Sequence, residues 1–293
     1  MSSFVTTAFV QQYKANVQLK LQQMGSRLRS AVTVETYMGK AAKAVEQVGP
    51  VEAVARTTRH GDTPLIHTPH DARWVHPKDY EWADLIDDQD KLRMLIDPQS
   101  PYSRNAAVAL GRSIDRAIIT AMDSDTTAKT GEDGDVNTAF VAGGGTIVAA
   151  GGTGMSVAKL RAAKLALMNA DVDVDNEDLF VAIKGKEHDE LLQDTLAVNL
   201  DYTTKPVLVE GRIFQFMGFN FIHTQLLGDD PAAPGTTRCP CWARSGVHLG
   251  MWNDINVKIS ERADKSYSTQ VYAKGTFGAT RIEEGKCVEI ECA

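Results

Sequence analysis

Hydrophobic residues recur every three or four positions along residues 4–28, FVTTAFVQQYKANVQLKLQQMGSRL, with glutamines and lysines between them. This spacing places the apolar side chains on one stripe of a helix. The stripe stands at a chain end and precedes a loosely patterned stretch that ends at Gly49 and Pro50, so the pattern predicts a helical arm over residues 1–50 that docks on another surface. The stripe consists of Val5, Phe9, Tyr13, Val17, Leu21, Met24 and Leu28.

Residues 51–96 change the pattern to extended segments interrupted by prolines and Gly61. Within them, residues 67–82 (HTPHDARWVHPKDYEW) alternate between mostly aromatic and mostly charged side chains. This period of two predicts a two-faced extended segment. An isolated hairpin is marginal in water, so the aromatic face must rest on other parts of the protein or on a neighbour. One face carries Ala72, Trp74, His76, Tyr80 and Trp82, and the other carries Asp71, Arg73, Asp79 and Glu81.

A helical period returns at residues 101–122, where Ser100 can cap the helix and Pro101 can occupy its first position. A helix of this length is about 30 Å long. Asp115 is available to pair locally with the arginines around it. The predicted buried stripe is Ala106, Leu110, Ile114, Ala117, Ile118 and Ala121, and the flanking charged residues are Arg104, Arg112, Asp115 and Arg116.

The second half of the chain alternates between strand and helix signals. Glycine-rich residues 123–154 predict a surface loop or hairpin, and residues 156–172 predict an amphipathic helix. Residues 178–194 predict a buried strand that leads into a helix, residues 207–227 predict strands joined through glycines, and residues 252–293 predict three further strands. The fold class is therefore α+β. The stripe of the second helix is Val157, Leu160, Ala163 or Lys164, Leu167 and Met168.

Composition is that of a soluble globular protein, with 43% hydrophobic and 24% charged residues among 293, and no apolar run long enough to span a membrane. No secretion signal is recognisable, so we expect function to begin in the cytoplasm. Residues 1–48 contain six basic and two acidic groups, a net +4, which leaves −11 on the rest of a chain whose formal charge is −7. A basic arm before an acidic body favours a protein partner over a dedicated DNA site.

Candidate chemistry is sparse. His67, His70 and His76 with Asp71 have the ligand types of a zinc or iron site, but Pro69 bars the helix that would align them. His188 and His223 stand without partner ligands along the chain and are interpreted as structural. The spacings of Cys239, Cys241, Cys287 and Cys292 match neither a zinc knuckle nor a redox motif, so free thiols are expected.

Three other motifs are incomplete. GGTGMS lacks the lysine of a phosphate-binding loop, and a calcium loop beginning at Asp133, Asp135 and Asn137 lacks the following glycine and the terminal glutamate. No serine stands in a nucleophile-elbow motif, and no cysteine has a recognisable catalytic frame. These absences favour a protein that is not an enzyme and needs no cofactor.

The order of elements resembles a tailed-bacteriophage major capsid protein of the Hong Kong 97 fold. Four segments carry this resemblance: LGRSIDRAIITAM at 110–122, SVAKLRAAKLALMNADV at 156–172, LDYTTKPVLVEGRIFQFMGFNFIHT at 200–224 and VYAKGTFGATRIEEGKCVEI at 271–290. Each is weakly specific alone, whereas their order and spacing together cover nearly the whole chain. The resemblance implies a subunit that self-assembles into the hexamers and pentamers of an icosahedral shell around double-stranded DNA.

The resemblance also implies an organisation into segments: an N-terminal arm at 1–50, an extended loop at 51–96, a peripheral domain with its spine helix at 97–172, an axial domain at 173–261, and closing strands of the peripheral domain at 262–293. Residues expected at contacts between subunits are Arg73, Trp74, His76, Asp79, Tyr80, Glu81 and Trp82 in the loop, and Phe9, Tyr13, Lys14, Lys20 and Arg27 in the arm. Arg104, Arg112, Asp115 and Arg116 are the expected spine residues.

Further partners follow from the same resemblance. Because the arm starts almost at Met1, a separate scaffolding protein is expected, together with a portal at one vertex, DNA packaged without sequence specificity and a cement protein. The shell would be assembled in the host cytoplasm and would end in the virion, with no membrane partner. Two alternatives stay open here: a cellular encapsulin compartment, which shares the fold, and a metal-dependent enzyme built on His67, His70 and His76.

Overall fold

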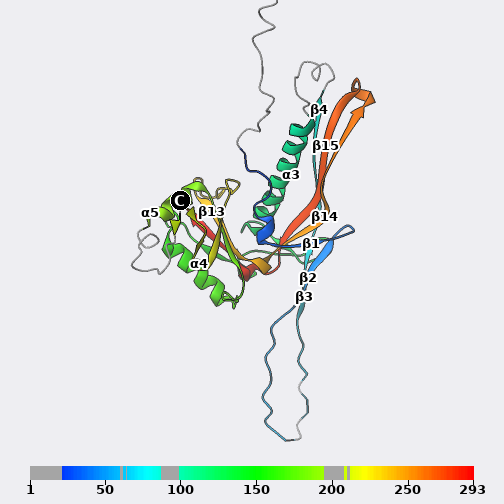
Figure 1. Ribbon diagram of the computed structural model, residues 1–293. Helices are drawn as coiled ribbons and strands as arrows, with labels where there is room; N and C mark the ends of the chain where they lie inside the picture. Colours follow the sequence, from blue (N-terminus) through cyan, green and yellow to red (C-terminus); the bar gives the residue numbers. More distant parts are fainter. Residues whose placement is uncertain (1–21, 60–61, 64, 87–98, 195–207, 210–211) are drawn as a thin grey trace, which may run out of the picture. The chain divides into compact units, whose positions relative to one another are not determined.

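The computed structural model describes residues 22–59, 62–63, 65–86, 99–194, 208–209 and 212–293 (Figure 1). Its contacts divide the chain into two compact units. Among the described residues, the first unit contains 22–26, 79–86, 99–113 and 253–276, and the second contains the remainder. Helix α3 (Gln99–Met122) and strands β14 (Val247–Arg262) and β15 (Ser268–Arg281) contribute residues to both units.

The first unit packs one side of α3 against a sheet. Strand β4 (Lys78–Ile86) and the long strands β14 and β15 belong to one sheet in the order β14, β15, β4. Ala106 and Leu110 of α3 are buried with Ala273 of β15. Half-buried side chains complete this core, namely Tyr80 and Trp82 of β4 and Ile255 and Val257 of β14.

The second unit is built on a six-stranded mixed sheet in the order β11 (Gln215–Phe216), β12 (Phe219–His223), β8, β13 (Thr237–Ala243), β16, β7. All five residues of β8 (Leu179–Ile183) are buried, as expected for a central strand covered on both faces. Helix α4 (Val157–Asn169) begins at the cap Ser156, whose hydroxyl accepts from the Lys159 N–H, and packs against β16 (Cys287–Cys292) and β7 (Thr146–Val148). Trp242 of β13 stacks on Phe180 with ring centroids 5.8 Å apart.

Two further strand arrangements complete the second unit. β1 (Thr33–Thr36) pairs in parallel with residues 248–251 of β14. β2 (Ala42–Val48) and β3 (His70–Val75) form an antiparallel hairpin that continues into β5 and β6. The remaining elements are β5 (Ala128–Lys129), β6 (Asn137–Thr138), α5 (Gly185–Gln193), β9 (Leu208–Val209), β10 (Arg212–Ile213) and short 3-10 turns at Arg29–Ala31, Arg244–Gly246, Ala263–Lys265 and Glu284–Lys286.

Much of the predicted secondary structure is confirmed. The long helix starts two residues earlier than predicted and ends at Met122, and α4 lies within residues 156–172. The strand and helix of residues 178–194, the strands around Gly218 and the three C-terminal strands are all present. The α+β class is confirmed. None of the described helices is long and apolar enough to cross a membrane.

Other expectations are wrong. Residues 22–28 are not helical: Gly25 has φ +73°, Met24 is exposed and Leu28 is fully buried, so the predicted stripe does not continue to residue 28. Met168 of α4 is exposed, and Lys159 is buried in the stripe instead. Ala117 of α3 is only half-buried. The expected segment boundaries at residues 172 and 262 stay a prediction; β7, β8 and β16, which lie on different sides of them, share the six-stranded sheet.

The single two-faced strand predicted around residues 71–82 is also wrong. β3 ends at Val75 and β4 starts at Lys78 in a different sheet, with Pro77 between them. Proline cannot donate to a strand ladder, which explains the break. The burial of β3 is inverted as well, because Arg73 and Val75 are buried.

Candidate functional site

The connection between β2 and β3, residues 49–69, is the β2–β3 loop, which extends well beyond the ends of its two strands (Figure 1). At its base the Gly49 N–H donates to the Pro69 carbonyl at 2.8 Å. A Cβ at Gly49 would lie 2.5 Å from the Pro69 ring, so only glycine fits there without a shift. Apolar side chains along this loop are exposed to solvent: Val51 (50%), Val54 (62%), Leu65 (82%) and Ile66 (43%).

The stem of this loop is held by a buried arginine. Arg73 of β3 is 5% exposed, and its guanidinium forms an ion pair with Glu284 at 2.9 Å and donates to the Ile282 carbonyl at 3.0 Å. Gln47 of β2 donates to the same carbonyl at 2.6 Å. Burial raises the pKa of Glu284, and the Arg73 charge opposes that rise. The stem is therefore anchored to the C-terminal region by a desolvated, hydrogen-bonded ion pair.

The predicted loop residues have different environments. Trp74 is half-buried and pairs with Lys43 and Lys129 in the sheet, and the His76 ring contacts the Glu132 carbonyl at 2.9 Å. Tyr80 and Trp82 pack on α3 within this chain. Asp79 accepts from the Thr276 hydroxyl at 2.7 Å, and Glu81 of β4 is exposed.

The histidine cluster does not form a metal site. No group of three histidine, cysteine or acidic side chains within the described ranges could hold a metal ion, and these ranges include His67, His70, His76 and Asp71. Asp71 instead pairs with Arg73 at 3.0 Å. The metal hypothesis is therefore not supported.

The arm and spine residues are only partly described. Phe9, Tyr13, Lys14 and Lys20 lie outside the described residues. Asp115 is fully buried and accepts from the backbone N–H groups of Arg27 (2.9 Å) and Leu28 (3.1 Å), so it holds this part of the arm in place and is not simply a flanking surface charge. Arg104 and Arg116 are exposed, and Arg112 donates to the Gln22 side chain at 2.5 Å.

A buried arginine that the sequence analysis missed closes the C-terminal end of α3. Arg281 is 1% exposed and donates to the carbonyls of Ala121 (2.6 Å) and Asp123 (2.8 Å) and also to that of Thr126. Its guanidinium lies 5.1 Å from the centre of the Phe140 ring. A cation at a helix C-terminus satisfies carbonyls that have no partner within the helix and interacts favourably with the helix dipole.

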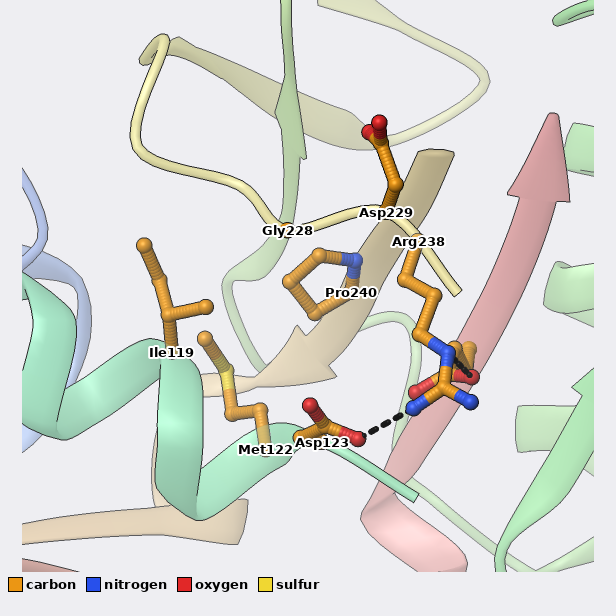
Figure 2. Close-up of a pocket in the computed structure, with 8 residues that line it drawn as sticks. Ile119, Met122, Asp123, Gly228, Asp229, Arg238 and Pro240 are labelled. Atoms are coloured by element: carbon orange, nitrogen blue, oxygen red, sulfur yellow. Dashed lines mark hydrogen bonds and ion pairs between the residues drawn. The ribbon is translucent and has the colours of Figure 1, made fainter. Parts of the chain in front are cut away.

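A second arginine, Arg238, lines a cavity of about 30 Å³ beside the C-terminal end of α3 (Figure 2). Ile119, Met122, Gly228 and Pro240 line the cavity as well. The guanidinium of Arg238 forms ion pairs with Asp123 (2.6 Å), Asp125 (2.8 Å), Asp230 (2.6 Å) and Glu289 (3.4 Å). The two arginines thus join the residues after α3 to strands β13, β15 and β16, and this network is a structural clamp.

Glu289 makes the clamp sensitive to pH. It is 2% exposed, and burial raises its pKa above the ordinary 4.5, although both Ser124 hydrogen bonds and the Arg238 charge oppose the rise. Between 4.5 and the raised value the folded chain binds more protons at Glu289 than the unfolded chain does. The contribution of this group to the free energy of unfolding is therefore largest below 4.5 and is lost as the pH rises through the folded pKa.

Glu289→Gln is expected to flatten the dependence of the free energy of unfolding on pH over that window, because the amide does not titrate and can still accept from Ser124. Urea denaturation of the full-length protein at a series of pH values measures this slope. Glu52→Gln, which neutralises an exposed glutamate of the β2–β3 loop, is the control and should keep the wild-type slope. A slope unchanged in Glu289→Gln would contradict the prediction.

The cysteines and the two remaining histidines complete the candidate groups. Cys239, Cys241, Cys287 and Cys292 are all buried and free, as expected. His188 and His223 were expected to be isolated, but their rings meet edge to face with centroids 4.7 Å apart. Sequence spacing could not reveal this contact, because α5 and β12 are brought together only by the pairing of β8 with β12.

Comparison with known proteins gives a consistent result. A family model described as phage capsid protein matches residues 5–293. The capsid structure of cyanophage P-SCSP1u has a TM-score of 0.73 at 18% identity and covers 99% of this chain and 94% of that chain. The capsid asymmetric unit of cyanophage Pam1 has a TM-score of 0.74 at 13% identity and covers 98% of each chain. A structure from Mycobacterium phage Che8 has a TM-score of 0.72 at 15% identity, with 96% of this chain and 97% of that chain covered. No curated protein matches by sequence.

Proposed function

This chain belongs to the phage capsid protein family and is a structural protein of a bacteriophage virion, and from that premise we propose that it forms the head shell of a tailed phage. In this proposal the subunits assemble into hexamers and pentamers with a Hong Kong 97-like fold, and the closed icosahedral shell encloses double-stranded DNA. The role is structural, without catalysis or a cofactor.

The β2–β3 loop is the observation that carries the proposal. Leu65 and Val54 are 82% and 62% exposed on a loop whose ends are fixed by the stem. Exposed apolar groups on a projecting segment gain free energy when a second protein surface covers them. A shell of many copies repeats such a contact at every subunit, so a modest gain per loop supports a closed assembly.

The two compact units suggest a division into peripheral and axial domains that differs from the expected one, which gave residues 97–172 and 262–293 to the peripheral domain and 173–261 to the axial domain. We assign α3 with β4, β14 and β15 to the peripheral domain, because the spine helix of the family crosses that domain, and the six-stranded sheet with α4 and α5 to the axial domain. Trp74 and Glu81 keep exposed surface and remain candidates for contacts between subunits, together with the β2–β3 loop. The arm residues Phe9, Tyr13, Lys14 and Lys20 are proposed to contact a neighbouring subunit.

The proposed partners are other copies of this chain, a scaffolding protein during assembly in the host cytoplasm, a portal, a cement protein and DNA bound without sequence specificity. The formal charge of −7 suits the last of these, since an acidic wall does not hold phosphates tightly. The encapsulin alternative is not favoured, because the family model that matches is that of phage capsids. The metal-enzyme alternative lacks a described ligand cluster.

Electron microscopy tests the proposal. The full-length protein is expressed with and without its neighbouring genes, separated on a sedimentation gradient and imaged. We expect closed shells or rings of five and six subunits in at least one preparation. A uniform monomer or dimer in both preparations would contradict the proposal, and a cargo protein that co-purifies with shells from an uninfected host would favour an encapsulin.

A further inference from the structure

A chain of polar side chains joins β1 to β14 in the second unit. Thr33 of β1 stands opposite His248 of β14, and the pairing continues past β1 because the Tyr37 N–H donates to the Met251 carbonyl at 2.9 Å. His248 is 2% exposed, whereas Glu35 on β1 is exposed. The Tyr37 ring contacts the rings of His248 and Trp252, with centroids 5.6 and 5.5 Å away.

Four contacts run along this chain. The Thr33 hydroxyl donates to the Val247 carbonyl at 2.9 Å and lies 3.2 Å from Nδ1 of His248. The Tyr37 hydroxyl lies 2.9 Å from Nε2 of His248 and 2.8 Å from Oε2 of Glu35. All four distances are in the hydrogen-bonding range.

The available hydrogens are one too few for these contacts. Each hydroxyl carries one hydrogen, and a neutral imidazole carries one on either Nδ1 or Nε2. A carboxylate and a carbonyl only accept. Three hydrogens therefore serve four contacts, and in either tautomer of neutral His248 one contact joins two acceptors. An additional proton on His248 makes both ring nitrogens donors, and every contact then has its hydrogen.

We propose that Glu35, Tyr37 and His248 form a proton-linked switch at the junction of β1 and β14. A proton taken from solvent binds the ring nitrogen of His248 that carries none, so that Nδ1 donates to the Thr33 hydroxyl oxygen, Nε2 donates to the Tyr37 hydroxyl oxygen, and the Tyr37 hydrogen is donated to Glu35. The protonated state is an imidazolium and a carboxylate bridged by a neutral tyrosine. This inference concerns the folded subunit and does not rest on the proposed shell.

The surroundings set the pH at which the switch operates. Burial lowers the pKa of His248 below its ordinary 6.5, and Glu35 is the charged group that opposes this shift. Burial and Glu35 together raise the pKa of Tyr37, so the tyrosine keeps its hydrogen throughout. His248 is therefore neutral near neutral pH and takes up its second ring proton only below its ordinary pKa of 6.5.

Solid-state NMR of the full-length protein with ¹⁵N-labelled histidine tests the switch, whether or not the protein is assembled. The His248 signal is assigned by its loss in His248→Asn. We expect it to change from neutral imidazole to imidazolium as the pH falls from about 8 to about 4.5. Glu35→Gln removes the opposing charge, and Tyr37→Phe removes the bridge, so each should move the midpoint to lower pH. His67, exposed on the β2–β3 loop, is the internal control and should keep its midpoint.

Two results would overturn the proposal. One is a His248 ring that stays neutral over the whole range. The other is a midpoint that is the same in the wild type, Glu35→Gln and Tyr37→Phe. Because Glu35 is exposed, Glu35→Gln should fold normally, and it decides the question even where Tyr37→Phe disturbs the packing.

Discussion

Replacing Arg281 with methionine is expected to lower the free energy of unfolding by about 3–5 kcal/mol, a large loss for one substitution. The methionine side chain fills much of the same space but donates no hydrogen bond. The carbonyls of Ala121, Asp123 and Thr126 would lose their shared donor, and a buried carbonyl without a partner costs about 1–3 kcal/mol. Denaturation in guanidinium chloride, followed by circular dichroism, measures the loss.

Two variants give this experiment its controls. Arg281→Lys keeps the charge but loses the planar fork of donors, so its loss should lie between those of the wild type and Arg281→Met. Arg262→Met removes an exposed arginine that pairs with Asp264 at 2.7 Å, and it should cost less than about 1 kcal/mol. Equal losses in Arg262→Met and Arg281→Met would show that the buried hydrogen bonds of Arg281 carry little of the stability.

Local periodicity was enough to predict α3 and α4. Ala106, Leu110, Ile114 and Ile118 follow the helical repeat and are all buried, because an amphipathic helix that packs on a sheet must bury one stripe. α4 begins at Val157, just inside the predicted segment 156–172, and Ser156 caps it; a cap of this kind depends only on residues within one helical turn. Such signals depend on residues a few positions apart.

Buried charges were not predictable from the same patterns. The alternation in β3 assigned Arg73 to the exposed face because arginine is polar, yet Arg73 is buried against Glu284. Asp115 looked like a surface residue of a helix and is fully buried under the backbone of Arg27 and Leu28. In each case the partner lies far away in sequence, and only the folded chain supplies the hydrogen bonds that make burial of the charge tolerable.

The expected extended loop and the observed hairpin cover different stretches of the chain. The excursion was placed at residues 51–96, whereas the stem begins in β2 at Ala42 and β3 ends at Val75. Aromatic residues drew attention to Tyr80 and Trp82, which pack on α3 of the same chain. The exposed aliphatic residues of the β2–β3 loop gave no sequence signal, because a valine on a loop and a valine in a core are indistinguishable without the fold.

The double variant Val54→Asp/Leu65→Asp is expected to abolish or severely reduce shell formation while leaving the subunit folded. Both side chains are largely exposed, so the free energy of unfolding should change by less than about 0.5 kcal/mol. A buried contact between subunits would instead gain two desolvated charges. A loss of about 2 kcal/mol or more at each interface weakens each contact more than about tenfold, and the effect repeats around the shell.

Sedimentation and electron microscopy measure the assembled fraction, and denaturation measures subunit stability. The matched control is Val136→Asp/Val141→Asp, which places the same charges at exposed valines (57% and 64%) outside the β2–β3 loop. If the control assembles and the loop variant does not, the loop contacts another subunit. If both variants fail, added negative charge alone prevents assembly. If the loop variant forms normal shells, the exposed apolar residues of the loop are not covered in the assembly, and the contact between subunits must lie elsewhere on the chain.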